Sequence, residues 1–321
     1  MRVLVTGIAG FIGSHLAERL VARGDDVVGL DNFDLHYDPR FKDANLRSLR
    51  ERAVIVTGDV LSQRTLERAF AHGPFDAVVH LAALPSVRAS IHEPWRFERV
   101  NVEGTAQLAY AVARYGMPRL VFASSGAVYG DNPALPHRET DRVDAPASPF
   151  GASKRGAELL LRSMNRSFGL TCTILRYYTV YGPRQPPTQA VHAFCRAALR
   201  GRPLELFGEG SALRDLVHVD DVVDATLAAV ERPPTARGVS VYNVSSGIGV
   251  RTSELAAAVG VALGKRVRLQ RGLPHPGEVV SSVGANDAAR RELGFAPRVA
   301  LEDGLADFAR WARRADRGDW V

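Results

Sequence analysis

The stretch that decides the fold is RVLVTGIAGFIG, residues 2–13. It joins a short apolar run to three glycines, and an amphipathic pattern with Leu16, Leu20 and Val21 on one face follows directly. A strand, a glycine-rich turn and a helix N-terminus in this order predict a cradle for a dinucleotide pyrophosphate, because bare backbone N–H groups and the helix dipole meet the anion. A tight turn without a ligand is the alternative. We assign the cofactor contacts of this turn to Gly7, Ala9, Gly10, Phe11, Ile12 and Gly13.

The second apolar run indicates which dinucleotide binds. Residues 27–30 end at Asp31, which stands 18 residues after Gly13. A carboxylate at this place accepts hydrogen bonds from an adenosine ribose and repels a 2′-phosphate. We therefore predict NAD rather than NADP, held by Asp31 and the adjacent Asn32. A solvated turn aspartate is the alternative.

Strand and helix patterns alternate over the first half of the chain. Short apolar strands are expected near 2–6, 26–30, 53–56, 76–80, 119–123 and 171–176. Amphipathic helices are expected between them at 12–23, 62–71, 95–115 and 151–168. This alternation predicts an α/β fold of the Rossmann type, a doubly wound parallel sheet with helices on both faces.

The alternation of strand and helix patterns stops after about residue 177, where Gly-Pro and Pro-Pro pairs separate short segments. We predict a dinucleotide-binding domain over 1–176 and a smaller C-terminal substrate-binding lobe over 177–321. Ligands of open α/β folds bind at the carboxyl ends of the strands, and the lobe is expected to cover that edge. Part of 217–245, notably 217–232 and 239–245, is expected to return to the large domain.

Phe150 stands where the surrounding pattern calls for a tyrosine. It opens FGASK, residues 150–154, at the start of an apolar-periodic run, so that positions 150 and 154 share a helix face. A Tyr–Lys pair at this spacing transfers protons, because the ammonium lowers the pKa of the phenol until phenolate acts as a base near neutrality. A phenyl ring has no proton to exchange. Phe150 therefore lacks the phenolic oxygen with which a tyrosine would act as the base.

Composition limits the other classes of function. With 321 residues, 46% hydrophobic and 24% charged, the chain has the composition of an ordinary globular protein. Its longest apolar runs fall short of the roughly 18 residues of a membrane span, and the N-terminus enters a strand at once, so we expect neither membrane segment nor signal peptide. Cys172 and Cys195 give no disulfide framework and no metal spacing, which favours a cytoplasmic, metal-free protein. The net charge of +6 comes from arginines scattered among acidic residues, and we expect no nucleic-acid partner.

Four motifs resemble the extended short-chain dehydrogenase/reductase family, and within it the sugar-nucleotide epimerases and dehydratases. They are residues 6–13, Ser124-Ser125, Phe150 with Lys154, and RYYTVYGPR at 176–184. The runs DNF at 31–33, YDP at 37–39 and LPSVR at 84–88 resemble the UDP-glucuronate 4-epimerases in particular. The resemblance covers essentially the whole chain. It implies NAD held as a prosthetic group and a UDP-sugar substrate.

The resemblance implies further contacts with the cofactor. Asp59 and Val60 follow the third strand, where the carboxylate would meet the adenine amino group; a helix N-cap is the alternative. Leu81, Ala82 and Ala83 end the fourth strand, where small side chains let a cofactor lie against the backbone. The remaining contacts fall to Ser124, Tyr177 and Lys154, the last of which would hold the nicotinamide ribose.

The same resemblance implies oxidation at C4 of the sugar, in which hydride passes to NAD and the hydroxyl proton to a tyrosine-type base. Hydride then returns to the other face of a 4-keto sugar. Arg184 and Arg214 are assigned to the diphosphate and uridine, because a guanidinium binds a diphosphate bidentately. The catalytic positions are Ser125, Phe150 and Lys154. The substrate contacts besides the two arginines are Pro85, Arg88, Ser125, Gly126, Ala127, Phe150, Thr179 and His275.

Assembly is also implied by the resemblance. Members of the family pair two amphipathic helices across a two-fold axis into a four-helix bundle. The corresponding stretches here are 95–115 and 151–168. We therefore expect a homodimer.

Phe150 leaves several interpretations open. It is either a deliberate Tyr→Phe change made to trap substrate, or a natural variant that has lost or relocated its base. Tyr129, Tyr177 and Tyr178 are the nearby candidates for a relocated base. The run Ser125-Gly126-Ala127 lacks the carboxylates of the dehydratases, which argues against 4,6-dehydration, whereas decarboxylation of a 4-keto uronate needs only the oxidation. A non-catalytic NAD-binding scaffold is the alternative from another class.

Overall fold

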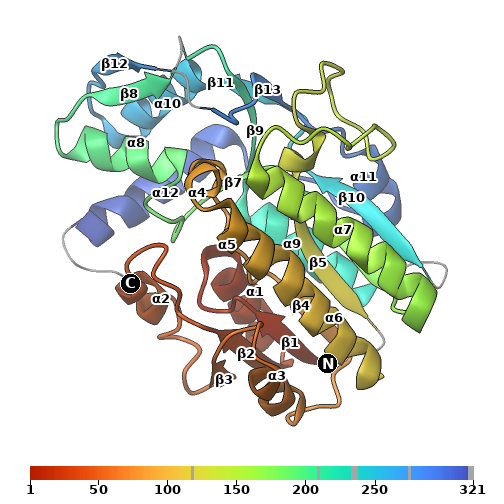
Figure 1. Cartoon of the computed structure of the whole chain (residues 1–321). Coiled ribbons are helices and arrows are strands. Elements are labelled where there is room, and N and C mark those ends of the chain that lie inside the picture. Colours follow the sequence, from red (N-terminus) through yellow and green to blue (C-terminus); the bar gives the residue numbers. More distant parts are fainter. Residues whose placement is uncertain (117–118, 208–209, 233–237, 274–275, 317–321) are drawn as a thin grey trace.

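The computed structural model describes residues 1–116, 119–207, 210–232, 238–273 and 276–316. Its centre is a seven-stranded sheet in the order β10-β6-β5-β4-β1-β2-β3, in which every neighbouring pair is parallel (Figure 1). This sheet confirms the predicted doubly wound α/β fold. Its strands are β1 (Arg2–Thr6), β2 (Asp26–Asp31), β3 (Val54–Thr57), β4 (Ala77–His80), β5 (Leu120–Ser125), β6 (Cys172–Tyr177) and β10 (Val239–Val244).

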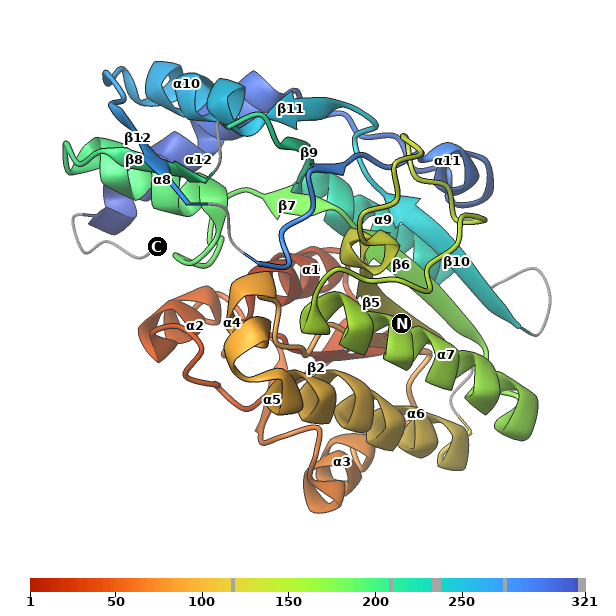
Figure 2. The ribbon, with the colours of Figure 1, turned by 45° about the horizontal axis from the view of Figure 1, so that its top comes forward.

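Helices cover both faces of the sheet, with one buried apolar cluster on each side. Figure 2 shows α1 and α9 on one side of the sheet and α6 and α7 on the other. The first layer consists of α1 (Phe11–Ala22), α9 (Val219–Glu231) and α11 (Asp287–Leu293). The second layer consists of α3 (Gln63–Phe70), α6 (Gly104–Arg114) and α7 (Pro149–Phe168).

The helix expected over 95–115 has three parts. It runs as α5 (Pro94–Glu98), a π-helical turn (Arg99–Glu103) and then α6. Two short helices that the sequence analysis did not expect, α2 (Pro39–Asn45) and α4 (Val87–His92), follow β2 and β4. Both begin at side-chain caps, because Asp38 accepts a hydrogen bond from the Arg40 N–H and Ser86 accepts one from the Ala89 N–H.

Local signals fix where α7 begins and ends. The Ser148 hydroxyl caps the Gly151 N–H at 3.2 Å, and Pro149 occupies the first helical turn. Gly169 ends the helix in the left-handed conformation at φ 68°. The first two turns of α7 carry Phe150 and Lys154, and Lys154 Nζ donates a hydrogen bond to the Ala123 carbonyl on β5 at 2.8 Å.

The lobe is built from the second half of the chain. Its strands are β7 (Thr179–Tyr181), β8 (Leu204–Phe207), β9 (Leu213–His218), β11 (Gly249–Arg251), β12 (Leu269–Gly272) and β13 (Ser281–Ser282). Its helices α8 (Ala190–Leu199), α10 (Thr252–Leu263) and α12 (Leu301–Asp316) enclose a third apolar cluster. Strand β10 and helix α9 belong to the large sheet and its cover. Helix α11 also packs there, against β10 and α9, which the sequence analysis did not expect.

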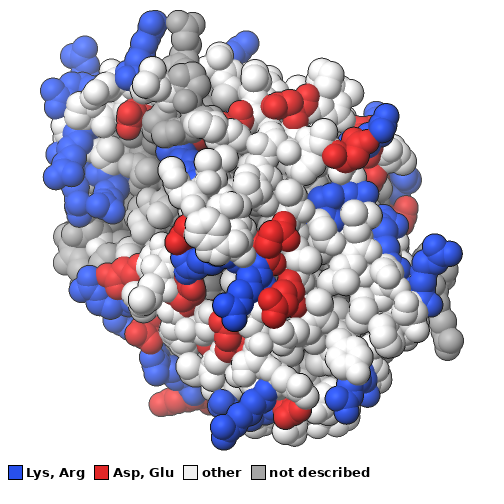
Figure 3. All heavy atoms as spheres, in the orientation of Figure 1, with Lys and Arg blue, Asp and Glu red and all other residues white. Residues whose placement is uncertain are grey.

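The surface shows a mixed charge pattern. In Figure 3 acidic side chains lie directly beside basic ones across the middle of the face shown. Several arginines form ion pairs with acidic residues from other parts of the chain, such as Arg19 with Asp224 and Arg96 with Asp34. None of the helices in the described part of the chain is long and apolar enough to cross a membrane.

Candidate active site

A cavity of about 800 Å³ opens at the carboxyl edge of the large sheet, where the lobe faces it. The carboxyl ends of the six strands β1 to β6, or the residues directly after them, contribute to its wall together with the N-terminus of α1, the first turns of α7 and parts of the lobe. Most of the predicted site residues line this one cavity. They are Gly7, Gly10, Phe11, Ile12, Gly13, Asp31, Asn32, Asp59, Val60, Leu81, Ala82, Ala83, Pro85, Arg88, Ser124, Ser125, Phe150, Lys154, Tyr177, Thr179 and Arg214.

The N-terminus of α1 provides an anion cradle at one end of the cavity. The cap residue Gly10 supplies no side-chain hydrogen bond, and residues 11–13 line the cavity. The first N–H groups of a helix have no partner within the helix, so here they are left for a ligand. A Cβ on Gly13 would lie 2.1 Å from the Gly7 carbonyl oxygen, which only glycine avoids. This uncapped end fits the diphosphate of a dinucleotide.

Asp31 lies buried at the end of β2 and faces the same cavity. Its carboxylate accepts hydrogen bonds from the Ala9 N–H at 3.1 Å, the Phe33 N–H at 2.8 Å and Lys42 Nζ at 3.3 Å. The assignment of Ala9 to the cofactor is not supported, because its N–H is used by Asp31 and its carbonyl accepts from Asn45 at 2.9 Å. The backbone of Ala9 therefore positions Asp31.

Asp59 meets the cavity one strand further along the sheet. Its carboxylate accepts hydrogen bonds from Asn32 at 2.8 Å and from the Leu61 N–H at 2.9 Å. The alternative of a helix N-cap is wrong, because α3 is capped by the Ser62 hydroxyl. Asn32 and Asp59 together form a polar wall next to Asp31.

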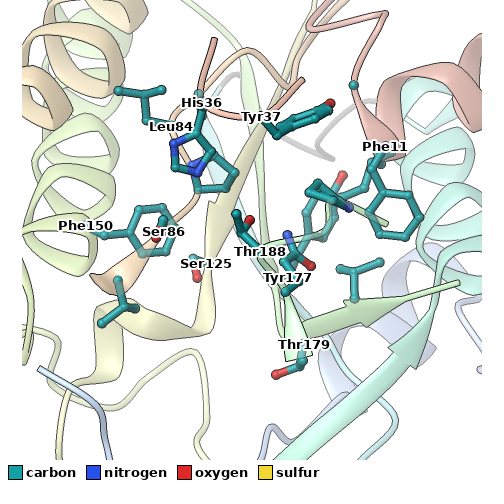
Figure 4. Close-up of a pocket in the computed structure, with 18 of the residues that line it drawn as sticks. Phe11, His36, Tyr37, Leu84, Ser86, Ser125, Phe150, Tyr177, Thr179 and Thr188 are labelled. Carbon is teal, nitrogen blue, oxygen red and sulfur yellow. The ribbon is translucent and has the colours of Figure 1, made fainter. Parts of the chain in front are cut away.

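Phe150 projects from α7 into the cavity. Figure 4 shows its ring directed toward Ser86 and Ser125, with Tyr177 and Thr179 across the space. The ring packs against Leu84 and Phe97, whose ring lies 6.4 Å away at 80°. The Ser125 hydroxyl accepts a hydrogen bond from the Ala127 N–H at 3.1 Å and keeps its own proton available.

Lys154 lies one helical turn after Phe150 and is 4% exposed. Its Nζ donates a hydrogen bond to the Ala123 carbonyl at 2.8 Å and stands 5.0 Å from the centre of the Phe122 ring. Burial lowers the pKa of Lys154 to about 7, although the Glu158 carboxylate acts in the opposite direction. The predicted catalytic positions Ser125, Phe150 and Lys154 thus line one cavity.

Behind these residues lies a buried ion pair. Arg176 donates two hydrogen bonds to Glu158, at 2.9 and 2.8 Å, and the two side chains are 2% and 0% exposed. Ser124 donates to the same carboxylate at 2.6 Å. The Ser124 hydroxyl therefore secures the end of β5 to α7, and the assignment of Ser124 to the cofactor stays a prediction, because the residue also lines the cavity.

The three tyrosines considered as relocated bases are all engaged elsewhere. Tyr129 donates to Asn243 at 2.8 Å, the Tyr177 hydroxyl pairs with Thr226 at 2.8 Å, and the Tyr178 hydroxyl lies 3.3 Å from His137 Nδ1. Burial raises the pKa of all three, that of Tyr129 to about 12. Phenolate is therefore disfavoured at each position near neutrality. Tyr177 contributes its ring to the cavity wall.

The wall of the cavity on the lobe side and at α4 contains two arginines, Arg88 and Arg214, and two glutamates, Glu205 and Glu278. Arg88 on α4 forms an ion pair with Glu278 of the lobe, with Nε and Nη2 at 2.9 and 2.7 Å from one carboxylate oxygen. Arg214 on β9 donates to the carbonyls of Leu213 and Val279, both at 2.9 Å. Burial lowers the pKa of Arg214, and Glu278 opposes this shift. Arg88 and Arg214 both line the cavity.

Three predicted substrate contacts do not line the cavity. Arg184 instead donates to Glu18 at 2.9 Å and Ser14 at 3.3 Å, both on α1. Gly126 faces the Tyr178 ring, which a Cβ would approach to 3.2 Å. Ala127 packs against the apolar cluster around Phe150. The remaining contact, His275, lies outside the described residues.

The structure adds cavity residues to which the sequence analysis gave no role. His36 and Tyr37 lie on the loop between β2 and α2, and Thr188 and Gln189 precede α8 (Figure 4). Lys42, which pairs with Asp31, also lines the wall. The YDP run at 37–39 was a visible signal for this loop. A buried lysine on a short helix has no such signal, because most lysines are exposed.

Comparison with known proteins gives a consistent result. Residues 3–245 match the model of the "NAD dependent epimerase/dehydratase family". The chain is 36% identical to UDP-glucuronate 4-epimerase 3 of Arabidopsis thaliana over 327 residues, which covers 96% of this chain and 76% of the relative.

Solved structures of nucleotide-sugar 4-epimerases are also similar to this chain. The UDP-glucose 4-epimerase of Thermotoga maritima with UDP-glucose has a TM-score of 0.90 at 34% identity, covering 98% of this chain and 99% of the other. A tyrosine-to-phenylalanine mutant of the Bacillus cereus UDP-glucuronic acid 4-epimerase, in complex with UDP-4-deoxy-4-fluoro-glucuronic acid and NAD, has a TM-score of 0.92 at 31% identity. It covers 98% of this chain and 100% of the other.

Proposed function

Because the chain belongs to the NAD-dependent epimerase/dehydratase family and uses NAD as its cofactor, we propose that it inverts C4 of a UDP-sugar, with UDP-glucuronate as the favoured substrate. The observation that carries this proposal is the arrangement of the cavity. Ser125, Phe150 and Lys154 line the cavity whose wall also includes the uncapped end of α1 and Arg88 and Arg214. One space thus offers a dinucleotide cradle, a proton-transfer position and cationic groups for a diphosphate.

The preference for a uronate rests on two supports. The named relatives include UDP-glucuronate 4-epimerases at about one third identity, one of them solved with a fluorinated UDP-glucuronic acid. The cavity also offers a hydroxyl at Thr179 and guanidinium groups at Arg88 and Arg214, which suit carboxylate and diphosphate oxygens. Against a uronate stands the run Gly126-Ala127: the family resemblance implies hydroxyl side chains at these positions to hold the carboxylate, and this chain has none there.

Each part of the chain then has a defined task. Bound NAD supplies hydride acceptance and return at C4. The N–H groups of α1 hold its diphosphate, and Asp31 meets the adenosine ribose. The Ser125 hydroxyl hydrogen-bonds the sugar oxygen that loses and regains a proton. Phe150 shapes the cavity but accepts no proton, so that the reaction lacks the base that a tyrosine would provide.

Restoring the hydroxyl tests the proposal. Phe150→Tyr is expected to raise C4 interconversion at least about a hundredfold, given the 10²–10⁴-fold contributed by a positioned base. The measurement is NMR-detected conversion of UDP-glucuronate, UDP-glucose and UDP-N-acetylglucosamine by both forms, with binding by calorimetry. Phe194→Tyr is the matched control, because it adds the same hydroxyl to the cavity wall from α8 and should give no gain.

Binding separates this proposal from the alternative. The unmodified chain should still bind the substrate, since Arg88 and Arg214 do not involve the missing hydroxyl. If Phe150→Tyr converts none of the three sugars and neither form binds any of them, the epimerase proposal fails. The chain is then better described as a non-catalytic NAD-binding scaffold, the function that Phe150 itself favours.

We also propose that two copies pair through α6 and α7. Tyr110 and Phe168, whose rings lie 5.9 Å apart, and Leu159 expose about half of their side-chain surface on these helices. Large apolar side chains gathered on two neighbouring helices fit a self-complementary interface. The buried free thiols of Cys172 and Cys195 suit a reducing compartment, and we propose the cytoplasm as the location.

A further inference from the structure

His80 ends β4 in the middle of the large sheet and takes no part in the proposed reaction. Its partner in the parallel register with β1 is Thr6, the last residue before the glycine turn. Both residues are buried, with His80 1% exposed and Thr6 0% exposed. A buried imidazole ring has two nitrogen atoms that each need a hydrogen-bond partner. The partners of His80 therefore indicate what the ring does.

Hydrogen bonds determine which nitrogen of the His80 ring carries the proton. Nε2 lies 3.1 Å from the Thr105 hydroxyl on α6. This hydroxyl donates its only proton to the Asn101 carbonyl at 2.6 Å, so it has to accept a hydrogen bond from Nε2. Burial and the charge of Lys154 lower the pKa of His80 to about 3, so the ring is neutral and Nδ1 carries no proton. The ring is therefore a donor toward α6 and an acceptor toward β1.

The acceptor side of the ring leads to the cofactor end of the cavity. Nδ1 of His80 accepts a hydrogen bond from the Thr6 hydroxyl at 2.7 Å. The Thr6 hydroxyl oxygen accepts the Ala82 N–H at 3.3 Å, and the Thr6 carbonyl accepts the Leu81 N–H at 3.1 Å. Leu81 and Ala82 both line the cavity. The ring thus orients a hydroxyl that holds the backbone of the cavity wall.

The cavity wall has no spare room at this point. Gly7 adopts the left-handed conformation at φ 74°, and a Cβ there would lie 2.8 Å from the Ala82 nitrogen. Gly7 also lines the cavity, and its carbonyl accepts the Gly10 N–H at 3.0 Å beside the N-terminus of α1. A displacement of Ala82 would therefore disturb the turn that forms the anion cradle.

The donor side of the ring leads to the opposite wall. Beyond Thr105, the Asn101 side chain accepts the Leu84 N–H at 2.9 Å and donates to the Ser153 hydroxyl at 3.0 Å. Ser153 lies on α7, and Leu84 packs against the Phe150 ring. The ring therefore belongs to one buried chain of hydrogen bonds that runs from the glycine turn to the helix that carries the catalytic positions.

We propose that His80 is a positioning residue for NAD, because its Nδ1 orients the Thr6 hydroxyl and thereby fixes Ala82 in the wall of the cofactor cavity. This inference rests on NAD as the cofactor and not on the reaction proposed above. The two hydrogen bonds of the ring have different tasks. The bond from Thr6 to Nδ1 controls how firmly NAD is held, and the bond from Nε2 to Thr105 anchors the ring.

Two substitutions of His80 separate these bonds. His80→Asn places an amide oxygen where Nδ1 stands and keeps an acceptor for Thr6. His80→Gln extends its amide to Thr105, in place of Nε2, and leaves the Thr6 hydroxyl without its acceptor. Both variants lack the ring, so a difference between them reports which of the two hydrogen bonds matters for NAD.

The first test measures the rate at which NAD leaves the protein. The holoprotein is loaded with radiolabelled NAD and mixed with excess unlabelled NAD, and the label that remains after desalting is followed over time. His80→Gln should release NAD about tenfold faster than the unmodified chain, the equivalent of about one hydrogen bond, and His80→Asn should stay within about threefold. His72→Gln, the same substitution at an exposed position, is the control and should leave the rate unchanged.

Stability is measured beside the release rate to test for a purely structural role. Each His80 variant keeps one of the two ring bonds, so urea unfolding should show comparable losses of stability for His80→Asn and His80→Gln. Equal release rates for the two variants, or rates that follow their losses of stability, would overturn the inference. Release of NAD from His80→Gln at the unmodified rate would overturn it as well.

A double-variant cycle tests whether His80 acts through Thr6. Thr6→Val is close to threonine in shape but has no hydroxyl, and it remains available if a His80 variant does not fold. It should release NAD as fast as His80→Gln does. The double variant should be no faster than either single variant, because both substitutions remove the same hydrogen bond. Additive effects would show that the two residues act separately and would overturn the inference.

The position of the ring proton can be observed directly. In ¹⁵N NMR spectra of protein labelled at histidine, the signals of His80 are those that disappear in His80→Asn. Nε2 should carry the proton at every pH at which the protein is folded and well above the His80 pKa of about 3. A proton on Nδ1 would leave that nitrogen unable to accept from Thr6 and would overturn the inference.

NAD release is measured without a sugar, so this inference and the proposed function fail separately. If Phe150→Tyr converts no sugar while His80→Gln still releases NAD faster than His80→Asn, the epimerase proposal falls and the role of His80 stands. If Phe150→Tyr converts a sugar and the two His80 variants release NAD equally fast, the epimerase proposal stands and the role of His80 falls.

Discussion

Removing the charge of Glu158 should destabilise the protein strongly. The carboxylate accepts four hydrogen bonds and is fully buried, as is its partner Arg176. Breaking a buried pair by removing one partner costs about 3–5 kcal/mol, because the other charge remains buried without compensation. Glu158→Gln retains an acceptor oxygen, and we therefore expect a loss of about 3 kcal/mol, or a fall in Tm of roughly 6–12 °C.

Urea unfolding followed by circular dichroism measures this loss. Asp307→Asn is the control, because the exposed Arg310–Asp307 pair on α12 should contribute less than about 1 kcal/mol. The double variant Glu158→Leu with Arg176→Met removes both charges and should be more stable than Glu158→Gln. A loss below about 1 kcal/mol for Glu158→Gln, or a double variant less stable than the single one, would refute the description of this pair as buried and coupled.

The same pair predicts a dependence on pH. Burial raises the pKa of Glu158, but hydrogen bonds from Arg176 and Ser124 lower it further, so the folded-state pKa lies below the ordinary 4.5. A carboxyl whose pKa is depressed on folding stabilises fully above the unfolded-state value, and this stabilisation is lost as the pH falls through the folded-state value. The stability difference between the unmodified chain and Glu158→Gln should therefore be constant above about pH 5 and shrink below 4.5.

Three other outcomes are expected. Chromatography after denaturation should release NAD from the purified chain, and tighter binding of NADP in titrations would contradict the role of Asp31. Gly13→Ala should abolish cofactor binding, because its Cβ would lie 2.1 Å from the Gly7 carbonyl, whereas Gly156→Ala, whose Cβ would meet Val102 at 3.4 Å, should bind NAD normally. Light scattering at micromolar concentration should give a dimer for the unmodified chain and a monomer for Leu159→Arg; a monomeric unmodified chain would refute the α6–α7 interface.

The parts of the site that the sequence predicted are those encoded locally. The strand–glycine turn–helix unit at residues 2–13 needs only neighbours in the chain, and so does the shared helix face of Phe150 and Lys154. The strand ends at Asp31 and Ser125 follow from the parallel topology, which brings all carboxyl ends to one edge. Alternation of elements therefore sufficed to place these residues around one cavity.

The parts that the sequence did not predict depend on distant partners. Arg184 turns to Glu18, 166 residues away along the chain, although its motif suggested a diphosphate contact. The Ser124 and Ser125 side chains point to opposite faces of β5, and the Ser124 hydroxyl donates to Glu158, a partner 34 residues away that the sequence does not indicate. His36 comes from the loop after β2, which the long-range Arg96–Asp34 ion pair ties down, and Lys42 comes from the short helix α2 that follows it.

The position of β10 has a consequence for how such a protein changes over evolution. The strand that completes the large sheet beside β6 comes from residues 239–244, after the chain has already built part of the lobe. If everything after residue 176 were exchanged for another sequence, β6 would lose β10, its neighbour at the sheet edge, and would expose a row of unpaired backbone groups. The residues of the lobe are therefore not one continuous segment of the chain, and recombination cannot exchange the lobe without also removing β10 from the large sheet. New sugar specificity has to arise by substitutions in the loops that line the cavity, while the sheet and the segments threaded through it are inherited together.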